Sequence, residues 1–330
     1  MSTPPASGRT PLAAPGGLTL LLLCIALLVS VSIGHSADRD RITVRVLIPR
    51  TTSALPFLLL ARDHPVAGVD FQVDTFLDHA QALAMLLRGE VDLLESGTSQ
   101  GWQNRLDGSP ILMVDTGVWA LSSLVGRDPS IRSFADLRGR KLALPFPGAP
   151  LDFQTRAILS HENMDADRDL TISYGPFAQS VSRLLAGQID AAALPEPVAT
   201  MAVRKNGLVR LLDYADAWAQ AAGGDGKSPQ VSLFATEHFA ESHRALVSTV
   251  VSAWREASRQ AAAHPSEVAA RFAAALDLEP GILAEAARRT AFEVPDYREN
   301  RSRVESYYRA VSPFIPGGAP ALDGGFFFAP

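Results

Sequence analysis

The chain has 330 residues, of which 47% are hydrophobic and 20% are charged, and its formal net charge is −5. This length and this apolar fraction allow more than one folded domain. A mildly acidic chain without a surplus of basic residues has no electrostatic means of holding nucleic acid or an anionic lipid surface, so we expect no nucleic-acid partner.

The first 36 residues have the layout of a secretory signal peptide. Arg9 precedes an apolar run over residues 18–33, and small residues then lead to a cleavage site at Ser36-Ala37. The run is short for a membrane span of ~20 residues, although an uncleaved anchor remains the alternative. Cys24, the only cysteine, lacks the small residues that a lipoprotein signal places before its cysteine. We therefore expect a periplasmic mature chain with net charge −6 and without any disulfide or thiolate metal site.

Strands and helices alternate through the first two thirds of the mature chain. Strands are predicted over residues 42–49, 69–76, 91–95, 141–144, 170–174, 189–194 and 231–235, with a long apolar stretch over 111–125. Helices are predicted over 56–61, 78–88, 133–139, 150–164 and 178–186, and four more at about 242–263, 265–277, 279–290 and 296–312. This alternation predicts an α/β fold with mainly parallel sheets and a helical C-terminal extension without strands.

Two segments 98 residues apart repeat each other. Residues 80–92 and 178–190 share six of thirteen residues: the initial Ala-Gln, the Leu pair, the Gly and the final Asp. Each copy is typical of an amphipathic helix that ends at a glycine and leads directly into an apolar strand. The repeat predicts two lobes of similar construction, each with a loop at the carboxyl end of a strand, where ligands of open α/β sheets bind.

The strand-free helical tail is expected to pack on the first lobe, so the chain has to cross between the lobes twice. We place the crossings near Trp119 and near Gln230. The predicted organisation is therefore a signal peptide (1–36), the first part of lobe I (37–118), lobe II (119–230) and a return to lobe I (231–330).

Three segments resemble parts of a known protein family. They are residues 131–143 (IRSFADLRGRKLA), 147–152 (PGAPLD) and 194–200 (LPEPVAT), within a resemblance over about residues 42–275. Taken together and in this order along the chain, they resemble segments of the periplasmic solute-binding proteins of ABC transporters, in the nitrate, sulfonate, taurine and thiamine-pyrimidine branch. The resemblance implies the two-lobed type II periplasmic-binding fold. It also implies a monomer that captures a small organic molecule, uses no cofactor and docks on an ABC permease in the inner membrane.

Candidate ligand contacts follow the predicted strands or lie at a crossing. They are Arg50, Thr51, Thr52, Ser53, Ser96, Gly97, Thr98, Trp119, Phe146, Gly148, Ala149 and Glu196. Short hydroxyls supply hydrogen bonds, aromatic rings stack on a ligand, and a carboxylate held between two prolines accepts from an amine or ring N–H. Other interpretations stay open: turn formation for the hydroxyls, solvated surface for Arg50, lobe core for Trp119, and a helix N-terminal acid for Glu196.

One departure from the family's pattern concerns the charge of the ligand. Where relatives of this kind use hydroxyls and free N–H groups at a helix start to hold an anionic head group, this chain has Ala149 and Pro150. Asp152 adds a negative charge in the same turn. We therefore expect a ligand of modest charge with some apolar or aromatic surface.

Catalytic patterns are weak. The seven histidines form no i,i+4 pair, no HExxH motif occurs, and no GxSxG sequence provides a serine nucleophile. Gly226-Lys227-Ser228 is a poor phosphate loop, because the earlier glycine is replaced by Ala221 and Pro229 prevents the following helix. We expect a binding protein, neither an enzyme nor a metalloprotein. The alternatives are an enzyme of the pyrimidine- or menaquinone-pathway type on the same scaffold, and a ligand sensor for a membrane kinase.

Overall fold

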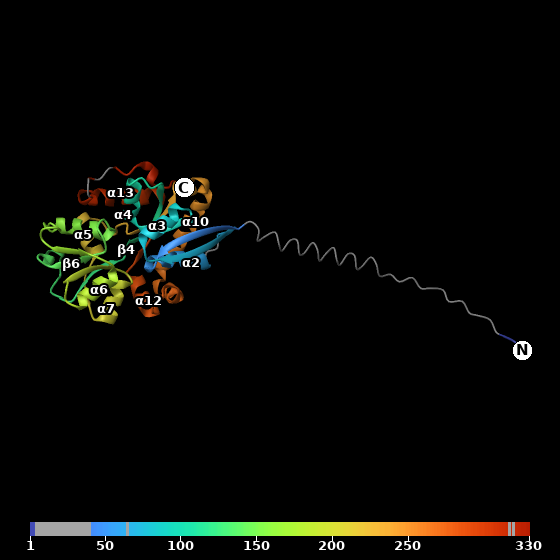
Figure 1. The fold of residues 1–330 in the computed structure, drawn as a ribbon, viewed down its shortest axis with the longest axis horizontal. Coiled ribbons are helices and arrows are strands. Elements are labelled where there is room, and N and C mark those ends of the chain that lie inside the picture. Colours follow the sequence, from blue (N-terminus) through green and yellow to red (C-terminus); the bar gives the residue numbers. More distant parts are fainter. Residues whose placement is uncertain (4–40, 64–65, 316–317, 319–320) are drawn as a thin grey trace. The chain divides into compact units, whose positions relative to one another are not determined.

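The computed structural model describes residues 1–3, 41–63, 66–315, 318 and 321–330, and every assigned helix and strand lies between Ile42 and Phe326. Figure 1 shows these elements as a ribbon. Residues 4–40 hold Cys24 and the apolar run and cleavage site of the predicted signal peptide, so those predictions lie outside the described residues.

The first sheet has six strands. Their spatial order is β11 (Ala291–Phe292), β4 (Ile111–Ala120), β10 (Val231–Thr236), β3 (Leu93–Gly97), β1 (Ile42–Pro49) and β2 (Val69–Phe76). Strands β1 and β3 are parallel, with Val46 opposite Leu93. Strand β10 is antiparallel to both β3 and β4, and β11 is antiparallel to β4.

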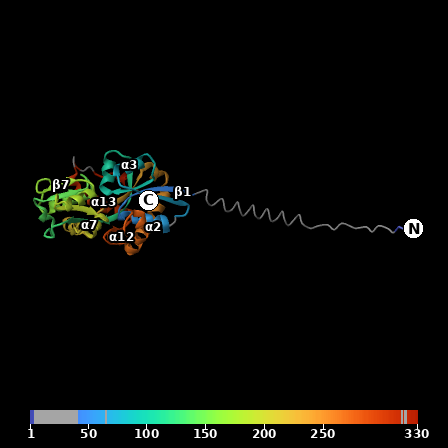
Figure 2. The same ribbon diagram turned by 60° about the horizontal axis from the view of Figure 1, so that its bottom comes forward.

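The second sheet has five strands, in the order β7 (Thr171–Tyr174), β6 (Lys141–Leu144), β8 (Ala191–Pro195), β5 (Ser122–Gly126) and β9 (Val209–Asp213). Strand β6 is parallel to β7 and β8, whereas β5 is antiparallel to β8 and β9. Figures 1 and 2 both show its elements gathered on one side of those of the first sheet.

The predicted α/β fold with two lobes is confirmed, and in each sheet most strands with a defined pairing run in the same direction. Both sheets are mixed, because β5 and β10 each follow a crossing and enter the other sheet against the direction of the strands beside them. The apolar stretch over 111–125 is also divided: β4 ends in the first sheet and β5 begins in the second, with Leu121 between them.

Helices surround both sheets. They are α2 (Leu55–Asp63), α3 (His79–Leu87), α4 (Thr98–Leu106), α5 (Pro150–His161), α6 (Phe177–Leu185), α7 (Val198–Asn206), α8 (Tyr214–Ala222), α9 (Glu237–Ser242), α10 (Arg244–Ala263), α11 (Pro265–Phe272), α12 (Pro280–Arg288) and α13 (Tyr297–Val311). Short 3-10 turns cover Thr52–Ala54, Phe134–Leu137, Ala274–Leu276, Ser312–Phe314 and Gly324–Phe326.

The 98-residue repeat is confirmed as a structural repeat. Read from β4 to β2, the first sheet matches the second read from β9 to β7 in strand order and in every strand direction that the pairing register defines. The two repeat glycines, Gly89 and Gly187, have φ values of 70° and 68°, which a residue with a Cβ rarely adopts. The two aspartates also correspond: Asp92 Oδ2 accepts from Arg45 N and Asp190 Oδ2 from Lys141 N, both at 2.8 Å.

Several elements are absent from the sequence prediction. The structure adds α4, the run α7–β9–α8, and the two-residue strand β11, which corrects the expectation of a tail without strands. Helices α10 and α11 pack on α2, whereas α13 contacts α5 and β4. Apolar side chains from Val44, Phe57 and Trp254 belong to the core beside the first sheet. In the described part of the chain, no helix is both long and apolar enough to cross a bilayer.

Candidate functional site

A cavity of about 100 Å³ lies where the two sheets meet. From the first-sheet side it is lined by residues at the ends of β1 and β3 and at the starts of α3 and α4, and from the second-sheet side by the loops after β6 and β8 and the starts of α5 and α6. The lining residues are Pro49, Thr51, His79, Gly97, Gln100, Leu121, Ser122, Pro145, Phe146, Ala149, Pro150, Leu151, Phe177, Pro195, Gln230 and Val231. Strand carboxyl ends and both crossings therefore meet at one place, as expected for a ligand site of this architecture.

The repeat extends to the cavity wall. His79 and Phe177 both lie immediately before an Ala-Gln pair, and both line the cavity. Gly97 and Pro195 end β3 and β8 and are 98 residues apart. Both line the cavity, Gly97 from the first-sheet side and Pro195 from the second-sheet side. Each lobe thus contributes the same two structural positions, with different chemistry at each.

Contacts across this cavity join the two sides. Ser99 Oγ at the start of α4 donates to Gly148 O at 2.9 Å, and Tyr307 Oη of α13 donates to Pro150 O at 3.2 Å. The rings of His79 and Phe146 lie with their centroids 6.2 Å apart. The lobes are therefore in contact around the cavity.

Four of the predicted contact residues line the cavity: Thr51, Gly97, Phe146 and Ala149. Gly148 lies in the same loop, with φ of 77°, and donates its N–H to Asp152 Oδ2. Sequence analysis missed the other lining residues. The repeat could have indicated His79 and Phe177, because each lies one position before the Ala-Gln pair that begins both copies.

Every predicted hydroxyl side chain of lobe I, including that of Thr51, has a hydrogen-bond partner within the protein. Thr52 Oγ1 lies 2.7 Å from Thr290 Oγ1, and Thr98 Oγ1 lies 2.8 Å from Ser232 Oγ. Ser53 and Ser96 also have side-chain partners, Glu95 at 3.1 Å and His79 at 3.3 Å respectively. These four residues support the wall from behind.

Arg50, one of the predicted contact residues, is exposed and is not among the lining residues. Its backbone N–H donates to Phe76 O, which fixes the chain as it leaves β1. Its solvated-surface interpretation is the one that the structure favours.

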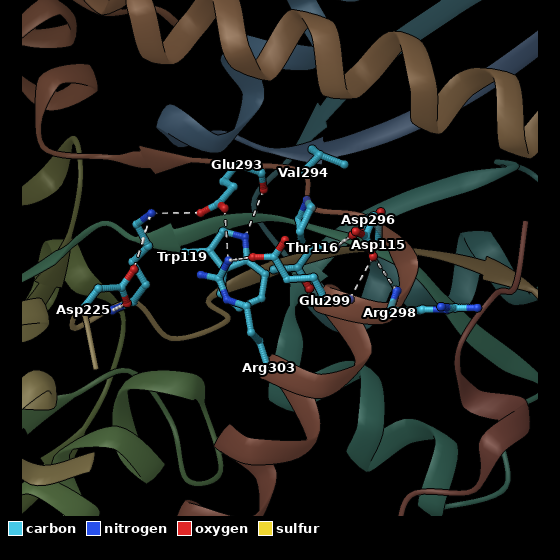
Figure 3. A network of polar contacts seen from close by, with 12 residues as sticks. Asp115, Thr116, Trp119, Asp225, Glu293, Val294, Asp296, Arg298, Glu299 and Arg303 are labelled. Carbon is cyan, nitrogen blue, oxygen red and sulfur yellow. Dashed lines mark hydrogen bonds and ion pairs between the residues drawn. The ribbon is translucent and has the colours of Figure 1, made fainter. Parts of the chain in front are cut away.

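Trp119 packs inside the protein, which favours the lobe-core interpretation over a ring that stacks on a ligand. The side chain is fully buried, its Nε1 donates to Glu293 O at 3.0 Å, and the Arg303 guanidinium lies 3.6 Å from a ring centroid. Lys227 Nζ contacts Glu293 Oε2 at 3.0 Å. Figure 3 shows Trp119, Glu293 and Arg303 together. Trp119 therefore ties the first crossing to the second crossing and to the segment after β11.

Glu196 is likewise occupied by the protein itself. Its Oε1 lies 2.8 Å from Arg210 Nη2, and Oε2 accepts from Thr200 N at 3.2 Å in the first turn of α7. Burial raises the pKa of this carboxyl in spite of the nearby arginine. Of the two interpretations left open by the sequence, the structure favours the helix N-terminal acid over a ligand contact.

A model described as the NMT1-like family matches residues 103–277, more than half of the chain. The chain belongs to the NMT1-like family. Among curated proteins, none matches the sequence.

Solved structures share the fold. A protein from Parabacteroides distasonis described as an ABC transporter is 20% identical, with a TM-score of 0.70 and coverage of 86% of this chain and 98% of that chain. The periplasmic aliphatic sulphonate binding protein SsuA from Escherichia coli is 19% identical, with a TM-score of 0.65 and coverage of 82% and 86%. The periplasmic nitrate-binding protein NrtA from Synechocystis PCC 6803 is 13% identical, with a TM-score of 0.67 and coverage of 84% and 83%. The two-lobed periplasmic-binding fold is thereby confirmed for this member of the NMT1-like family.

The cavity of this family member is largely apolar and carries no formal charge at neutral pH. Of the described residues that line it, none is Lys, Arg, Asp or Glu. Burial lowers the pKa of His79, so its imidazole is neutral at pH 7. Ser122 Oγ is buried and has no hydrogen-bond partner among the described residues. Such a site can hold an apolar or aromatic face and offer a few hydrogen bonds, and it contains no cation to neutralise an anion.

A fully buried carboxyl lies behind the lobe I wall. Glu95 Oε2 accepts from Ser53 Oγ at 3.1 Å, and Ser53 Oγ lies 2.9 Å from the Thr51 hydroxyl that lines the cavity. Burial raises the pKa of Glu95 to about 8. The group is therefore protonated and uncharged at pH 7. Within the described residues, no group of three or more His, Cys, Asp or Glu is arranged to hold a metal ion.

Proposed function

We propose that this protein is the substrate-binding component of an ABC import system. It captures a small organic molecule between its two lobes in the periplasm and delivers it to a permease in the inner membrane. The observation that carries the proposal is the cavity at the meeting point of two related lobes, lined from both sides by equivalent positions of an internal repeat. The transport receptors among its structural neighbours support it.

The proposal includes the boundaries and the export signal predicted from the sequence. Lobe I comprises residues 37–118 and 231–330, lobe II comprises 119–230, and a signal peptide is removed near Ser36-Ala37. The mature protein acts as a monomer and needs no cofactor. Its function is to bind and release a solute, so it has no catalytic residues, and its neighbours favour this interpretation over an enzyme on the same scaffold.

The proposed contact set is the part of the sequence prediction that lines the cavity, namely Thr51, Gly97, Phe146 and Ala149, together with Ser122. Binding energy is used to keep the lobes together, because a ligand stabilises the state that it contacts from both sides. The closed shape then reports occupancy to the permease.

A thermal-shift screen of the mature protein against vitamins, pyrimidines, sulfonates and aromatic acids tests the proposal. A ligand that binds only the native state raises the melting temperature by an amount that grows with the logarithm of its concentration over its Kd. Ser122→Leu fills the cavity and is expected to weaken the best compound by more than about tenfold, whereas Ser252→Leu on the exposed face of α10 leaves it unchanged. Equal affinity in both variants would contradict the assignment of this cavity, and the absence of any hit would count against a receptor.

A further inference from the structure

The first turn of α5 holds a carboxylate of the protein itself beside the cavity. Asp152 is 3% exposed, and its Oδ2 accepts from Gly148 N at 2.8 Å. Its Oδ1 accepts from Arg156 Nε and from Tyr174 Oη, both at 3.0 Å. The carboxylate is therefore fixed by partners on three sides, in the same helix turn as the lining residues Pro150 and Leu151.

The other backbone donors at this helix start are also in use. Ala149 N donates to Phe146 O at 3.3 Å, and the N–H groups of Asp152 and Phe153 both donate to Ala149 O. Pro150 has no N–H. A helix N-terminus attracts anions because its free N–H groups and its dipole point toward them. Here the Asp152 carboxylate already supplies the negative charge, and most of the N–H groups already have acceptors.

The charges around this turn leave no surplus of positive charge for a ligand. Arg156 is shared between two carboxylates, because its Nη1 also contacts Asp167 Oδ2 at 2.9 Å. The described lining residues include no lysine or arginine, and the buried acid on the opposite side, Glu95, lies behind Thr51. An anionic group entering the cavity would meet the negative charge of Asp152, and the one guanidinium beside that carboxylate, Arg156, is already shared with Asp167.

We propose that Asp152 is a specificity-determining residue whose carboxylate occupies the anion position at the start of α5, so that the cavity selects an uncharged molecule with an apolar or aromatic face over an anionic one. The unpartnered Ser122 hydroxyl supplies a hydrogen bond to a polar atom of that molecule. This inference rests on the proposed function, since it concerns the ligand of the same cavity. The structural neighbours named above are described as sulphonate-binding and nitrate-binding proteins, and both of these ligands are anions.

The test uses two probes of similar shape and different charge, benzenesulfonamide and benzenesulfonate, with calorimetry and thermal shift on the mature protein. Asp152→Ser removes the carboxylate and releases Gly148 N–H. Asp167→Ser is the matched control, because it removes the other carboxylate from Arg156 while Gly148 N–H keeps its acceptor. Asp152→Asn removes the charge while keeping the side-chain shape, and it serves if Asp152→Ser does not fold.

The expected result is that benzenesulfonate has no measurable effect on the wild type or on Asp167→Ser. It binds the Asp152 variant, with an affinity at least about tenfold above the highest affinity that the wild-type data allow. Three results would overturn the inference: benzenesulfonate binding the wild type as tightly as the sulfonamide, a folded Asp152 variant with no gain, or an equal gain in Asp167→Ser. Tight sulfonate binding by the wild type would still be capture of a solute, so it would refute the specificity and leave the proposed function standing.

Discussion

Replacing the buried Glu95 by glutamine should stabilise the protein relative to the wild type, and this stability difference should grow as the pH rises. Burial penalises the charged form of this carboxyl and raises its pKa from the ordinary value of 4.5 to about 8 in the folded protein. Between these two values the folded protein holds a proton that the unfolded chain releases, so the free energy of unfolding falls as the pH rises. The slope is about 1.4 kcal/mol for each pH unit, and the whole window corresponds to about 5 kcal/mol.

Glutamine has no proton to lose and keeps an oxygen that accepts from Ser53. The stability of Glu95→Gln relative to the wild type is therefore expected to grow from pH 5 to pH 8 and to level off above pH 8. Urea unfolding at five pH values between 5 and 9 measures this difference, and the linear extrapolation gives each free energy. Glu241→Gln, at an exposed position of α9, is the control and should show no such trend.

A stability difference that stays constant from pH 5 to pH 8 would refute this reasoning, because it would mean that Glu95 does not change protonation between the two states. A variant less stable than the wild type at pH 8 would refute it more strongly. That outcome would show that the ionised carboxylate contributes stability in the fold.

Two further substitution pairs follow from packing and charge. In Gly101→Ala the new Cβ would lie 2.0 Å from ring atoms of Phe234, so thermal unfolding should show a loss of about 1–3 kcal/mol. In Gly281→Ala the new Cβ meets nothing within 4 Å, and a gain of about 0.5–1 kcal/mol is expected; equal effects in the two variants would contradict the packing. Arg210→Met leaves the buried Glu196 carboxylate unpaired and should cost about 3–5 kcal/mol. Adding Glu196→Gln should recover part of this loss in chemical denaturation, and a purely additive double variant would argue against the pair.

The two lobes could be predicted from the sequence because both copies of the repeat keep the residues that end the helix and fix the start of the strand. A glycine at the helix end and an aspartate at the strand start occur in both copies, and the structure uses both in the same way in each lobe. Strand β6 and strand β2 agree with their predicted ranges because turn residues bound each of them.

Other features depend on tertiary structure and leave little trace in the sequence. The passage from β4 to β5 occurs within one apolar run, so hydropathy alone does not place the break at Leu121. Helix α4 contains one glycine and few apolar residues, and its periodicity is correspondingly weak. Trp119 and Glu196 are residue types that serve equally as ligand contacts and as buried structural groups, and only their partners decide between the two roles.

The most direct test of the central claim, capture of a solute by closure of two lobes, is a distance measurement across the cavity. The predicted mature chain has no cysteine, so Ser182→Cys on α6 and Ser252→Cys on α10, both exposed, can be labelled as a fluorescent donor and acceptor pair without further changes. The account predicts that the best compound from the thermal-shift screen raises the energy-transfer efficiency saturably, and that Ser122→Leu abolishes the change. An efficiency that stays constant while calorimetry records binding of the same compound would contradict it.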